Sequence, residues 1–313
     1  MKALIIGAGG FVGGYLIREL SSAGWDVHAS CLPTETIREN CTVHHLDIME
    51  KDSITALLNN VMPDIIYHLA AQSSVSVSWK KPQLTAEINV IGTINVLEAL
   101  REAEKKDIRT ILIGSGEEYG FIRQGACPLS ETESLNPGNI YAATKACQGM
   151  LGEIYARAYK MDIVMVRAFN HSGPEQSEIF VISDFCKQVA EIEKGMREPV
   201  ICVGNLEAMR DFTDVRDVVK AYRLLGEKGK SGQAYNVGRG RAVKIQYILD
   251  TVLSFAEKPI EVKQDPKRMR ASDIPLIEPD VAKIYADTGW KAEISMEQTI
   301  RDTLDNWRTK LKE

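Results

Sequence analysis

Residues that could transfer a proton gather in the middle of the sequence. Ser115 and Glu117 follow the apolar run at 111–113, and Tyr141 and Lys145 stand further along in a helix-forming stretch. A short run of Ile and Leu that ends at a glycine is typical of a buried strand. Open α/β sheets bind their ligands at the carboxyl ends of such strands. Tyr141 and Lys145 have the spacing that places two side chains on one face of a helix.

These residue types together predict chemistry on a carbonyl or an alcohol. A Lys145 ammonium beside the Tyr141 phenol favours the phenolate and would lower the pKa of that tyrosine. The Ser115 hydroxyl could bond the same substrate oxygen, which completes a proton-transfer device. An isolated Tyr-x-x-x-Lys pattern is more often a core tyrosine and a solvated lysine. The preceding strand and the glycine turn described next favour the catalytic interpretation.

A glycine-rich turn at the start of the chain predicts a dinucleotide site. It joins a predicted strand at 3–6 to a helical pattern at 15–20. Gly7, Gly10 and Gly13 allow a tight turn, a close approach to a pyrophosphate, and close packing of helix on strand. The amino terminus of the helix then faces the anion.

The second predicted strand, at 26–30, leaves the choice between NAD and NADP open. An acid usually ends this strand in enzymes specific for NAD. Here Ser30 and Cys31 occupy that place, the first acid is Glu35, and the nearest arginine is Arg38. Because no carboxylate would repel a 2′-phosphate at residues 30 and 31, the pattern tilts slightly toward NADP.

Two further strands end where a coenzyme would lie. The strand at 42–46 leads to residues placed to meet an adenine, and the strand at 65–71 ends in small residues that let a coenzyme lie flat. His68, within the latter strand, is expected to be a core histidine. The residues predicted to contact the coenzyme here are Asp47, Ile48, Leu69, Ala70 and Ala71.

With a sixth strand at 161–167, the pattern predicts an α/β fold with a doubly wound parallel Rossmann sheet. Residues 1–168 are interpreted as an NAD(P)-binding domain to which the chain returns around 212–239. Residues 169–313 mainly form a smaller C-terminal α/β substrate domain. Beyond the third strand, helices are expected at 51–60, 83–104, 180–195, 215–225, 245–255, 280–288 and 295–311. Strands are expected at 200–203 and 234–237, and a loop at 204–212. The strand at 234–237 is expected to rejoin the sheet.

Composition narrows the class of protein. A 313-residue chain with 44% apolar residues can bury a sizeable core, and a net charge of −5 argues against a nucleic-acid surface. No apolar run approaches membrane-spanning length, and the first residues enter a strand without a signal-peptide pattern. The six cysteines lack Cys-x-x-Cys spacing, so we expect reduced thiols in the cytoplasm. His44 and His45 lack partners at metal-binding spacing, so no metal is expected.

The long helix at 83–104 and the helix at 140–159 both carry apolar faces. The two could form a four-helix contact in a homodimer. Equally, both faces could simply cover the sheet.

The motifs together resemble the extended short-chain dehydrogenase/reductase family over the whole chain. The resemblance implies that Tyr141 is the acid/base, that Lys145 holds the nicotinamide ribose and tunes the tyrosine, and that Ser115 polarises the reacting oxygen. The coenzyme contacts predicted in all are Gly7, Gly10, Phe11, Val12, Gly13, Ser30, Asp47, Ile48, Leu69, Ala70, Ala71, Tyr141, Lys145, Phe169 and His171.

Within that family the chain resembles the branch that acts on GDP-6-deoxy-4-keto-mannose. The resemblance rests on 115–120, 169–174, 203–217 and 270–275. It implies reduction of the C4 ketone by NAD(P)H, giving GDP-rhamnose or its C4 epimer GDP-6-deoxytalose. Dehydration of GDP-mannose, another nucleotide-sugar epimerase or dehydratase, and a non-catalytic NAD(P)-binding regulator are the alternatives, and the intact Ser, Tyr and Lys argue against the regulator.

Three residues bear on the choice between reductase and dehydratase. Gln176 stands where dehydratases carry an arginine that contacts a neighbouring subunit's cofactor, and this favours the reductase. Glu117 matches the base that removes the C5 proton in dehydratases, yet it also occurs in the reductase pattern. Gly116 stands where a serine is usual in both.

Three cations in the second half could bind the diphosphate of a nucleotide sugar. Arg210 and Arg270 lie in predicted loops and Lys187 lies on a predicted helix. A guanidinium fork suits a diphosphate, although any one of these charges could simply be solvated. The predicted substrate contacts are Ser115, Glu117, Asn170, Lys187, Arg210 and Arg270.

Overall fold

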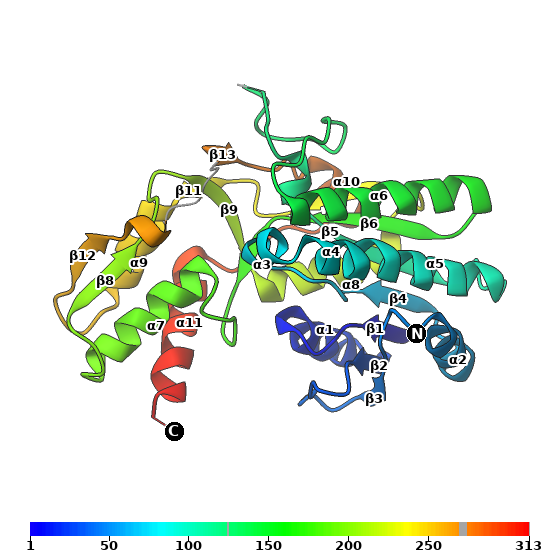
Figure 1. Cartoon of the computed structure of the whole chain (residues 1–313), viewed down its shortest axis with the longest axis horizontal. Helices are drawn as coiled ribbons and strands as arrows, with labels where there is room; N and C mark the ends of the chain where they lie inside the picture. Colours follow the sequence, from blue (N-terminus) through cyan, green and yellow to red (C-terminus); the bar gives the residue numbers. More distant parts are fainter. Residues whose placement is uncertain (124, 269–273, 313) are drawn as a thin grey trace.

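The structure is a computed structural model that describes residues 1–123, 125–268 and 274–312. Within these residues, seven parallel strands form the central sheet in the order β10-β6-β5-β4-β1-β2-β3 (Figure 1). This confirms the predicted α/β doubly wound fold, including the late strand that rejoins the sheet. The strands are β1 Lys2–Ile6, β2 Asp26–Cys31, β3 Thr42–His45, β4 Ile65–His68, β5 Arg109–Ser115, β6 Ile163–Ala168 and β10 Ala234–Val237.

Helices cover both faces of this sheet, as its apolar strands require. On one face, α1 (Phe11–Ser22), α8 (Val215–Lys228) and α10 (Ala282–Thr288) bury apolar side chains against the strands. On the other face lie α2 (Lys51–Val61), α5 (Gly92–Glu102) and α6 (Ile140–Tyr159). The carboxyl ends of the parallel strands therefore form one edge at which ligands can bind.

The stretch expected to be one helix at 83–104 is interrupted, so that prediction needs correction. After α3 (Val75–Lys80), the chain forms α4 (Pro82–Ala86), a π-helical turn (Glu87–Ile91) and then α5. The π turn buries Asn89, whose amide bonds the neighbouring helix α6. Such turns often occur at functional sites.

The second half of the chain builds a smaller α/β unit, drawn at the left of Figure 1. A mixed sheet there contains a strand where we expected the loop at 204–212, and that prediction is wrong from residue 209 onward. Its Arg and Asp residues break the apolar pattern by which a strand is predicted from sequence. Three neighbouring strands nevertheless pair with its backbone. The elements are β7 Asn170–Ser172, β9 Met209–Asp214, β11 Ala242–Lys244, β13 Leu276–Ile277, the parallel pair β8 Val200–Val203 and β12 Glu261–Gln264, and the helices α7 Val181–Glu193, α9 Ile245–Ser254 and α11 Met296–Lys310.

A separate apolar core lies beneath α7, α9 and α11, whereas α8 and Trp290 belong to the core of the large sheet. The chain thus crosses back to the sheet after entering the second unit. A domain boundary at residue 168 stays a prediction.

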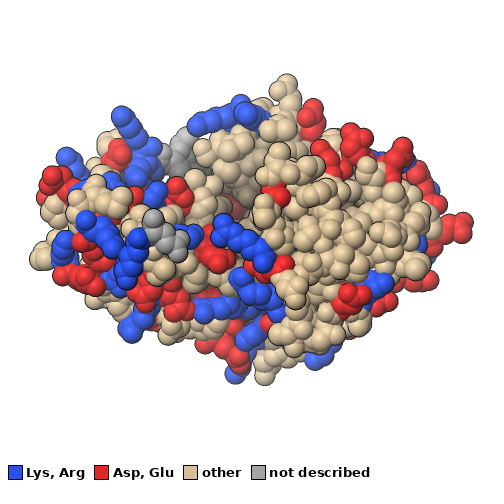
Figure 2. Space-filling view, turned by 90° about the horizontal axis from the view of Figure 1, so that it is seen from below, with Lys and Arg blue, Asp and Glu red and all other residues tan. Residues whose placement is uncertain are grey.

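Charged side chains are unevenly spread over the surface. In the view of Figure 2, blue and red side chains alternate over the half formed by the smaller unit, and a broad area with few charges covers the other half. The mixture of signs gives this face no extended basic surface. Among the described residues, no helix has the length and apolarity needed to cross a membrane.

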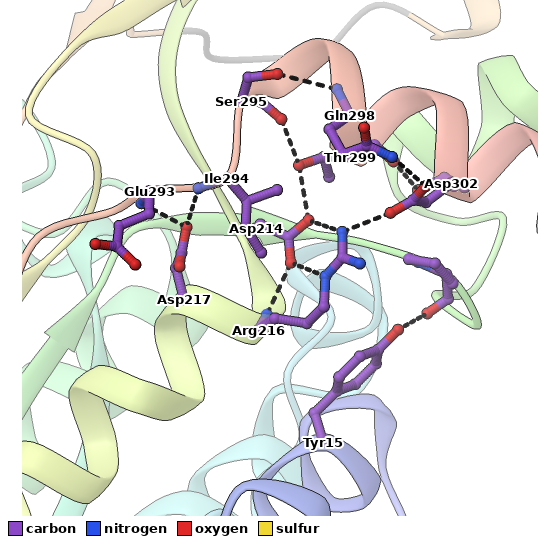
Figure 3. Close-up of polar contacts among 12 residues, drawn as sticks. Tyr15, Asp214, Arg216, Asp217, Glu293, Ile294, Ser295, Gln298, Thr299 and Asp302 are labelled. Carbon is purple, nitrogen blue, oxygen red and sulfur yellow. Dashed lines mark hydrogen bonds and ion pairs between the residues drawn. The ribbon is translucent and has the colours of Figure 1, made fainter.

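Two buried carboxylates connect the end of β9 and the start of α8 to the C-terminal segment (Figure 3). Asp214 accepts hydrogen bonds from the guanidinium of Arg216 at 2.8 Å and from the Thr299 hydroxyl at 2.7 Å. Arg216 also pairs with Asp302 at 2.7 Å. Since Thr299 and Asp302 lie on α11, these bonds fix that helix against the junction of β9 and α8.

The second carboxylate, Asp217, accepts the backbone N–H groups of Glu293 and Ile294 at 2.9 and 2.8 Å. The Asp217→Ala change should therefore lower the free energy of unfolding by about 2–3 kcal/mol, because two partly buried N–H donors would lose their acceptor. Urea denaturation followed by tryptophan fluorescence measures this. The matched control is Asp250→Ala on the exposed face of α9, where a change within about 0.5 kcal/mol is expected. Equal losses in both variants would contradict this role.

Candidate active site

Strand β5 delivers Ser115 to the ligand-binding edge of the sheet, and a short 3-10 turn (Gly116–Tyr119) follows it. The Ser115 hydroxyl accepts the N–H of Glu117 at 3.2 Å, and the Ser115 N–H donates to the Glu118 carboxylate at 2.6 Å. These two bonds form a capping box. They fix the Ser115 backbone and direct Glu117 toward the start of the next helix.

That helix, α6, carries both other members of the predicted device. Asn139 caps it by accepting the N–H of Ala142 at 2.8 Å, and its amide donates to the Glu117 carboxylate at 3.2 Å. Tyr141 lies in the first turn, close enough to Ser115 for that side chain to influence the pKa of its phenol. The structure thus brings Ser115, Glu117 and Tyr141 together, as predicted.

Lys145 lies one turn further along α6 and is buried. Its ammonium donates to the Ile113 carbonyl at 2.7 Å and to the Gln148 side chain at 2.9 Å. Burial lowers the pKa of Lys145 to about 8, and the charge of Glu118 partly opposes that shift. The lysine is therefore held beneath the site by β5.

The prediction that Lys145 lowers the pKa of Tyr141 is wrong for this arrangement. Burial raises that pKa, the hydrogen bond from Ser115 partly offsets the rise, and the charges of Glu118 and Glu117 add to it. The physical reason is that burial is the largest influence on this phenol, and the Lys145 ammonium, which bonds the Ile113 carbonyl and Gln148, is not among the charges that shift its pKa. The phenol consequently keeps its proton at neutral pH.

Glu118 is a buried residue of the site that we did not predict. Burial raises its pKa to about 7, against the opposing bond from the Ser115 backbone and the nearby charge of Arg167. Arg167 lies 3.5 Å from the carboxylate and also donates to the Tyr119 hydroxyl at 2.9 Å. The Ser-x-x-Glu spacing of a capping box was visible in the sequence and could have identified Glu118.

The glycine turn fits a dinucleotide. A Cβ atom on Gly7 would lie 2.5 Å from Ala70, and one on Gly13 would lie 2.1 Å from the Ala8 carbonyl. Gly10, which starts α1 without a side-chain cap, faces open space. The turn is thus closed against the sheet and open at the helix amino terminus, where a pyrophosphate binds. Phe11 and Val12 follow in the first turn of α1.

Strands β2, β3 and β4 complete the predicted coenzyme surface. The Ser30 carbonyl accepts the N–H groups of Gly7 and Ala8, while its buried hydroxyl has no hydrogen-bond partner. The N–H groups of Leu69 and Ala70 both donate to the Ile6 carbonyl. At the end of β3, the remaining predicted pair consists of an exposed Asp47 and a buried Ile48.

A buried amide connects the loop after β4 to helix α6, which carries Tyr141 and Lys145. Asn89 in the π turn accepts the N–H of Gln72 at 2.8 Å and donates to the Thr144 hydroxyl at 2.9 Å. Thr144 in turn donates to the Tyr141 carbonyl at 2.7 Å. No local signal pointed to this network, because its members come from distant parts of the chain.

A small pocket adjoins Glu117, on the side of the second unit. Arg210 lines it from β9, whereas we placed this residue in a loop; its guanidinium donates to the carbonyls of Met209 and Ile274 at 2.9 and 2.6 Å. The strand backbone holds Arg210 at the pocket, so this predicted contact lines the same pocket as Glu117. The lining residues are Gly116, Glu117, Phe169, Asn170, Arg210, Asp211 and Ile277.

The Phe169 ring, which lines this pocket, accounts for the glycine at residue 116. A Cβ atom there would lie 2.9 Å from the Phe169 ring, so the ring packs directly on the backbone of the 3-10 turn after β5. His171 stacks with Phe11 at a centroid distance of 6.3 Å, and burial lowers its pKa. Phe169 and His171 therefore connect the turn after β5 with the glycine turn.

Asp211 is a second buried acid that we did not predict. Its two oxygens accept the N–H groups of Arg239 and Arg241 at 2.8 Å each. Burial raises the pKa of Asp211 to about 6 despite these bonds. The carboxylate fixes the loop after β10 beside the pocket.

Two predicted substrate contacts are not brought to this pocket. The Lys187 ammonium pairs with Glu178 at 3.2 Å and Glu191 at 3.8 Å, and it lies over the Trp307 ring. Arg270 lies outside the described residues. Both remain predictions.

The structure also shows the surroundings of the histidine, the glutamine and the cysteines discussed from the sequence. His68 is buried against Thr93, which confirms the predicted core histidine, and burial lowers its pKa to about 3. Gln176 is buried and donates to the His171 carbonyl at 2.9 Å. The six cysteines are free. No cluster of three metal-binding side chains occurs in the parts of the chain that the structure describes.

Comparison with known proteins supports this assignment of the motifs. The family model for GDP-mannose 4,6 dehydratase matches residues 4–303. GDP-6-deoxy-D-mannose reductase of Pseudomonas aeruginosa is 32% identical over 100% of this chain and 99% of its own length. GDP-mannose 4,6-dehydratase of Vibrio cholerae is 26% identical over 95% of this chain and 91% of its own.

Solved structures show the same fold. The structure of RMD from Pseudomonas aeruginosa complexed with NADPH has a TM-score of 0.88 at 32% identity, covering 99% of this chain and 100% of that one. Thermus thermophilus UDP-glucose 4-epimerase, complexed with NAD, has a TM-score of 0.87 at 27% identity, covering 98% and 99%. These matches confirm the resemblance drawn from the motifs. The chain belongs to the GDP-mannose 4,6 dehydratase family.

Proposed function

We propose that this protein is an NAD(P)H-dependent reductase of the C4 ketone of GDP-4-keto-6-deoxy-D-mannose. The product is GDP-D-rhamnose or its C4 epimer. The observation that carries the proposal is the convergence of Ser115, at the carboxyl end of β5, and Tyr141, in the first turn of α6, with Lys145 beneath them. The similarity to GDP-6-deoxy-D-mannose reductase over the full chain supports the choice of substrate.

When bound, the coenzyme supplies the hydride for the ketone. Tyr141, whose phenol is protonated at neutral pH, donates the proton to the C4 oxygen. Ser115 donates a hydrogen bond to the same oxygen. Lys145 holds the nicotinamide ribose and contributes a positive charge below its pKa of about 8.

The coenzyme and the sugar nucleotide would use opposite sides of this site. The glycine turn, Phe11 and Val12, the ends of β2, β3 and β4, and Phe169 with His171 would hold the coenzyme. Asn170 and Arg210 line the pocket beside Glu117, where the sugar would bind. Lys187 and Arg270 are the further cations proposed for the diphosphate.

We also propose that the protein works in the cytoplasm as a homodimer. Buried residues such as Val96 and Leu97 cover the sheet, but Leu84, Ile91, Met150 and Ile154 are exposed on the neighbouring segments α4 to α6. Apolar side chains exposed side by side favour a partner. The six free cysteines fit a reducing compartment.

For the dimer, sedimentation equilibrium at micromolar concentration should report twice the 34.8 kDa chain mass. The double change Met150→Glu and Ile154→Glu should yield monomers, because it places buried like charges in the contact. A matched pair of changes at exposed apolar residues of the smaller unit, Ile179→Glu and Met196→Glu, should leave the dimer intact. A monomeric parent protein would contradict the proposal.

The function itself is tested by incubating the protein with GDP-4-keto-6-deoxymannose and NADH or NADPH. Coenzyme oxidation should keep step with loss of the ketone, and NMR of the product gives the configuration at C4. GDP-mannose should not be converted at a comparable rate. Glu117→Gln should leave reduction largely working, because C5 is untouched in a reductase.

The dehydratase alternative makes the opposite forecast. There Glu117 would remove the C5 proton, and the coenzyme would be regenerated in each turnover. Formation of the keto sugar from GDP-mannose, without net coenzyme consumption and blocked by Glu117→Gln, would show that the protein is a dehydratase.

Tyr141→Phe should lower kcat by about 10² to 10⁴-fold, because the ring stays and only the proton donor is lost. Coenzyme affinity, measured by fluorescence titration, should stay nearly unchanged. Tyr285→Phe on α10 is the control, since that tyrosine is exposed, and it should retain full activity. A Tyr141→Phe enzyme within a few-fold of the parent would remove the tyrosine from the mechanism.

A further inference from the structure

A tight turn after β2 returns an acidic side chain to the end of that strand. The Glu35 N–H donates to the Leu32 carbonyl at 2.9 Å, and the Leu32 N–H donates to the Glu35 carboxylate at 3.0 Å. The carboxylate is thus fixed beside the last residues of β2, although it lies four positions beyond Cys31 in the sequence.

The same carboxylate lies on the glycine turn. A Cβ atom added to Gly9 would be 2.5 Å from the Glu35 Oε2 atom and 3.0 Å from its Cβ. Glu35 therefore occupies the corner between the glycine turn and the end of β2. In dinucleotide-binding folds this corner receives the adenosine ribose, and an acid there bonds the 2′-hydroxyl.

The other charges near this corner do not favour a phosphate. Arg18 pairs with Glu39 at 2.6 Å and lies 3.7 Å from Glu175. Glu39 itself reaches the next turn of α1, 2.5 Å from where a Cβ atom on Gly14 would lie. The loop between β2 and β3 contributes one further cation, Arg38, whose side chain is exposed.

We propose that Glu35 makes this protein select NAD(H) over NADP(H). Its carboxylate accepts a hydroxyl hydrogen bond from an unmodified ribose and repels a 2′-phosphate at the same position. This replaces the slight preference for NADP that the residues at 30 and 31 suggested. The inference rests on the proposed function only in requiring that a nicotinamide coenzyme binds.

Direct binding measurements test the inference without the sugar. Titration of the protein with NADH and with NADPH, followed by nicotinamide fluorescence, should give NADH at least about tenfold tighter affinity, the scale expected of one charge-assisted hydrogen bond. Glu35→Gln should bring the two affinities within a few-fold of each other, by strengthening NADPH binding and weakening NADH binding. Since the side chain is exposed, this variant should fold normally, which near-UV circular dichroism verifies.

Two further variants sharpen the result. Asp26→Asn removes an exposed charge at the opposite end of β2 and should leave the ratio of affinities unchanged. Arg38→Gln should also leave it unchanged. A parent protein that prefers NADPH, together with loss of that preference in Arg38→Gln, would overturn the role of Glu35 and assign the 2′-phosphate to Arg38. Equal affinities in the parent would also overturn it, whereas binding of neither coenzyme would overturn the proposed function as well.

Discussion

The site depends on how the start of α6 is bound to the end of β5. The Lys145 ammonium and the Gln148 amide both donate to the Ile113 carbonyl, at 2.7 and 3.1 Å. Asn139 adds a bond to Glu117 from the helix amino terminus. A buried ammonium is costly unless it is paired, and these acceptors offset that cost. The docking places a phenol from α6 against a hydroxyl from β5, which chain proximity alone would not do.

Buried charge is concentrated around this contact. The raised pKa of Glu118 and the lowered pKa of Lys145 have the same principal cause, which is removal from water. Glu118 is nevertheless kept in place, because it accepts the Ser115 N–H and lies near Arg167. Groups with shifted pKa values are common at functional sites, and here they surround the residues proposed for catalysis.

Strand β9 couples the substrate side of the site to the packing of the whole second unit. Arg210 and Asp211 at its start line the pocket, and Asp214 at its end binds α11 through Thr299 (Figure 3). Tyr15 on α1 donates to the Pro174 carbonyl at 2.9 Å, which links the helix of the glycine turn to the segment after β7. A shift of the second unit would therefore move the pocket wall relative to the glycine turn.

By itself, the sequence determined the parallel sheet, the glycine turn and the Ser115, Tyr141 and Lys145 set, because apolar runs, glycines and helical spacing are local signals. Tertiary structure decided what depends on contacts between distant segments. Strand β9 was hidden because its Arg and Asp side chains are paired by partners elsewhere in the chain. The pKa of Tyr141 follows burial, which spacing does not reveal. Glu35 looked too distant from β2 in sequence, and only the turn at Leu32 returns its carboxylate to the glycine turn.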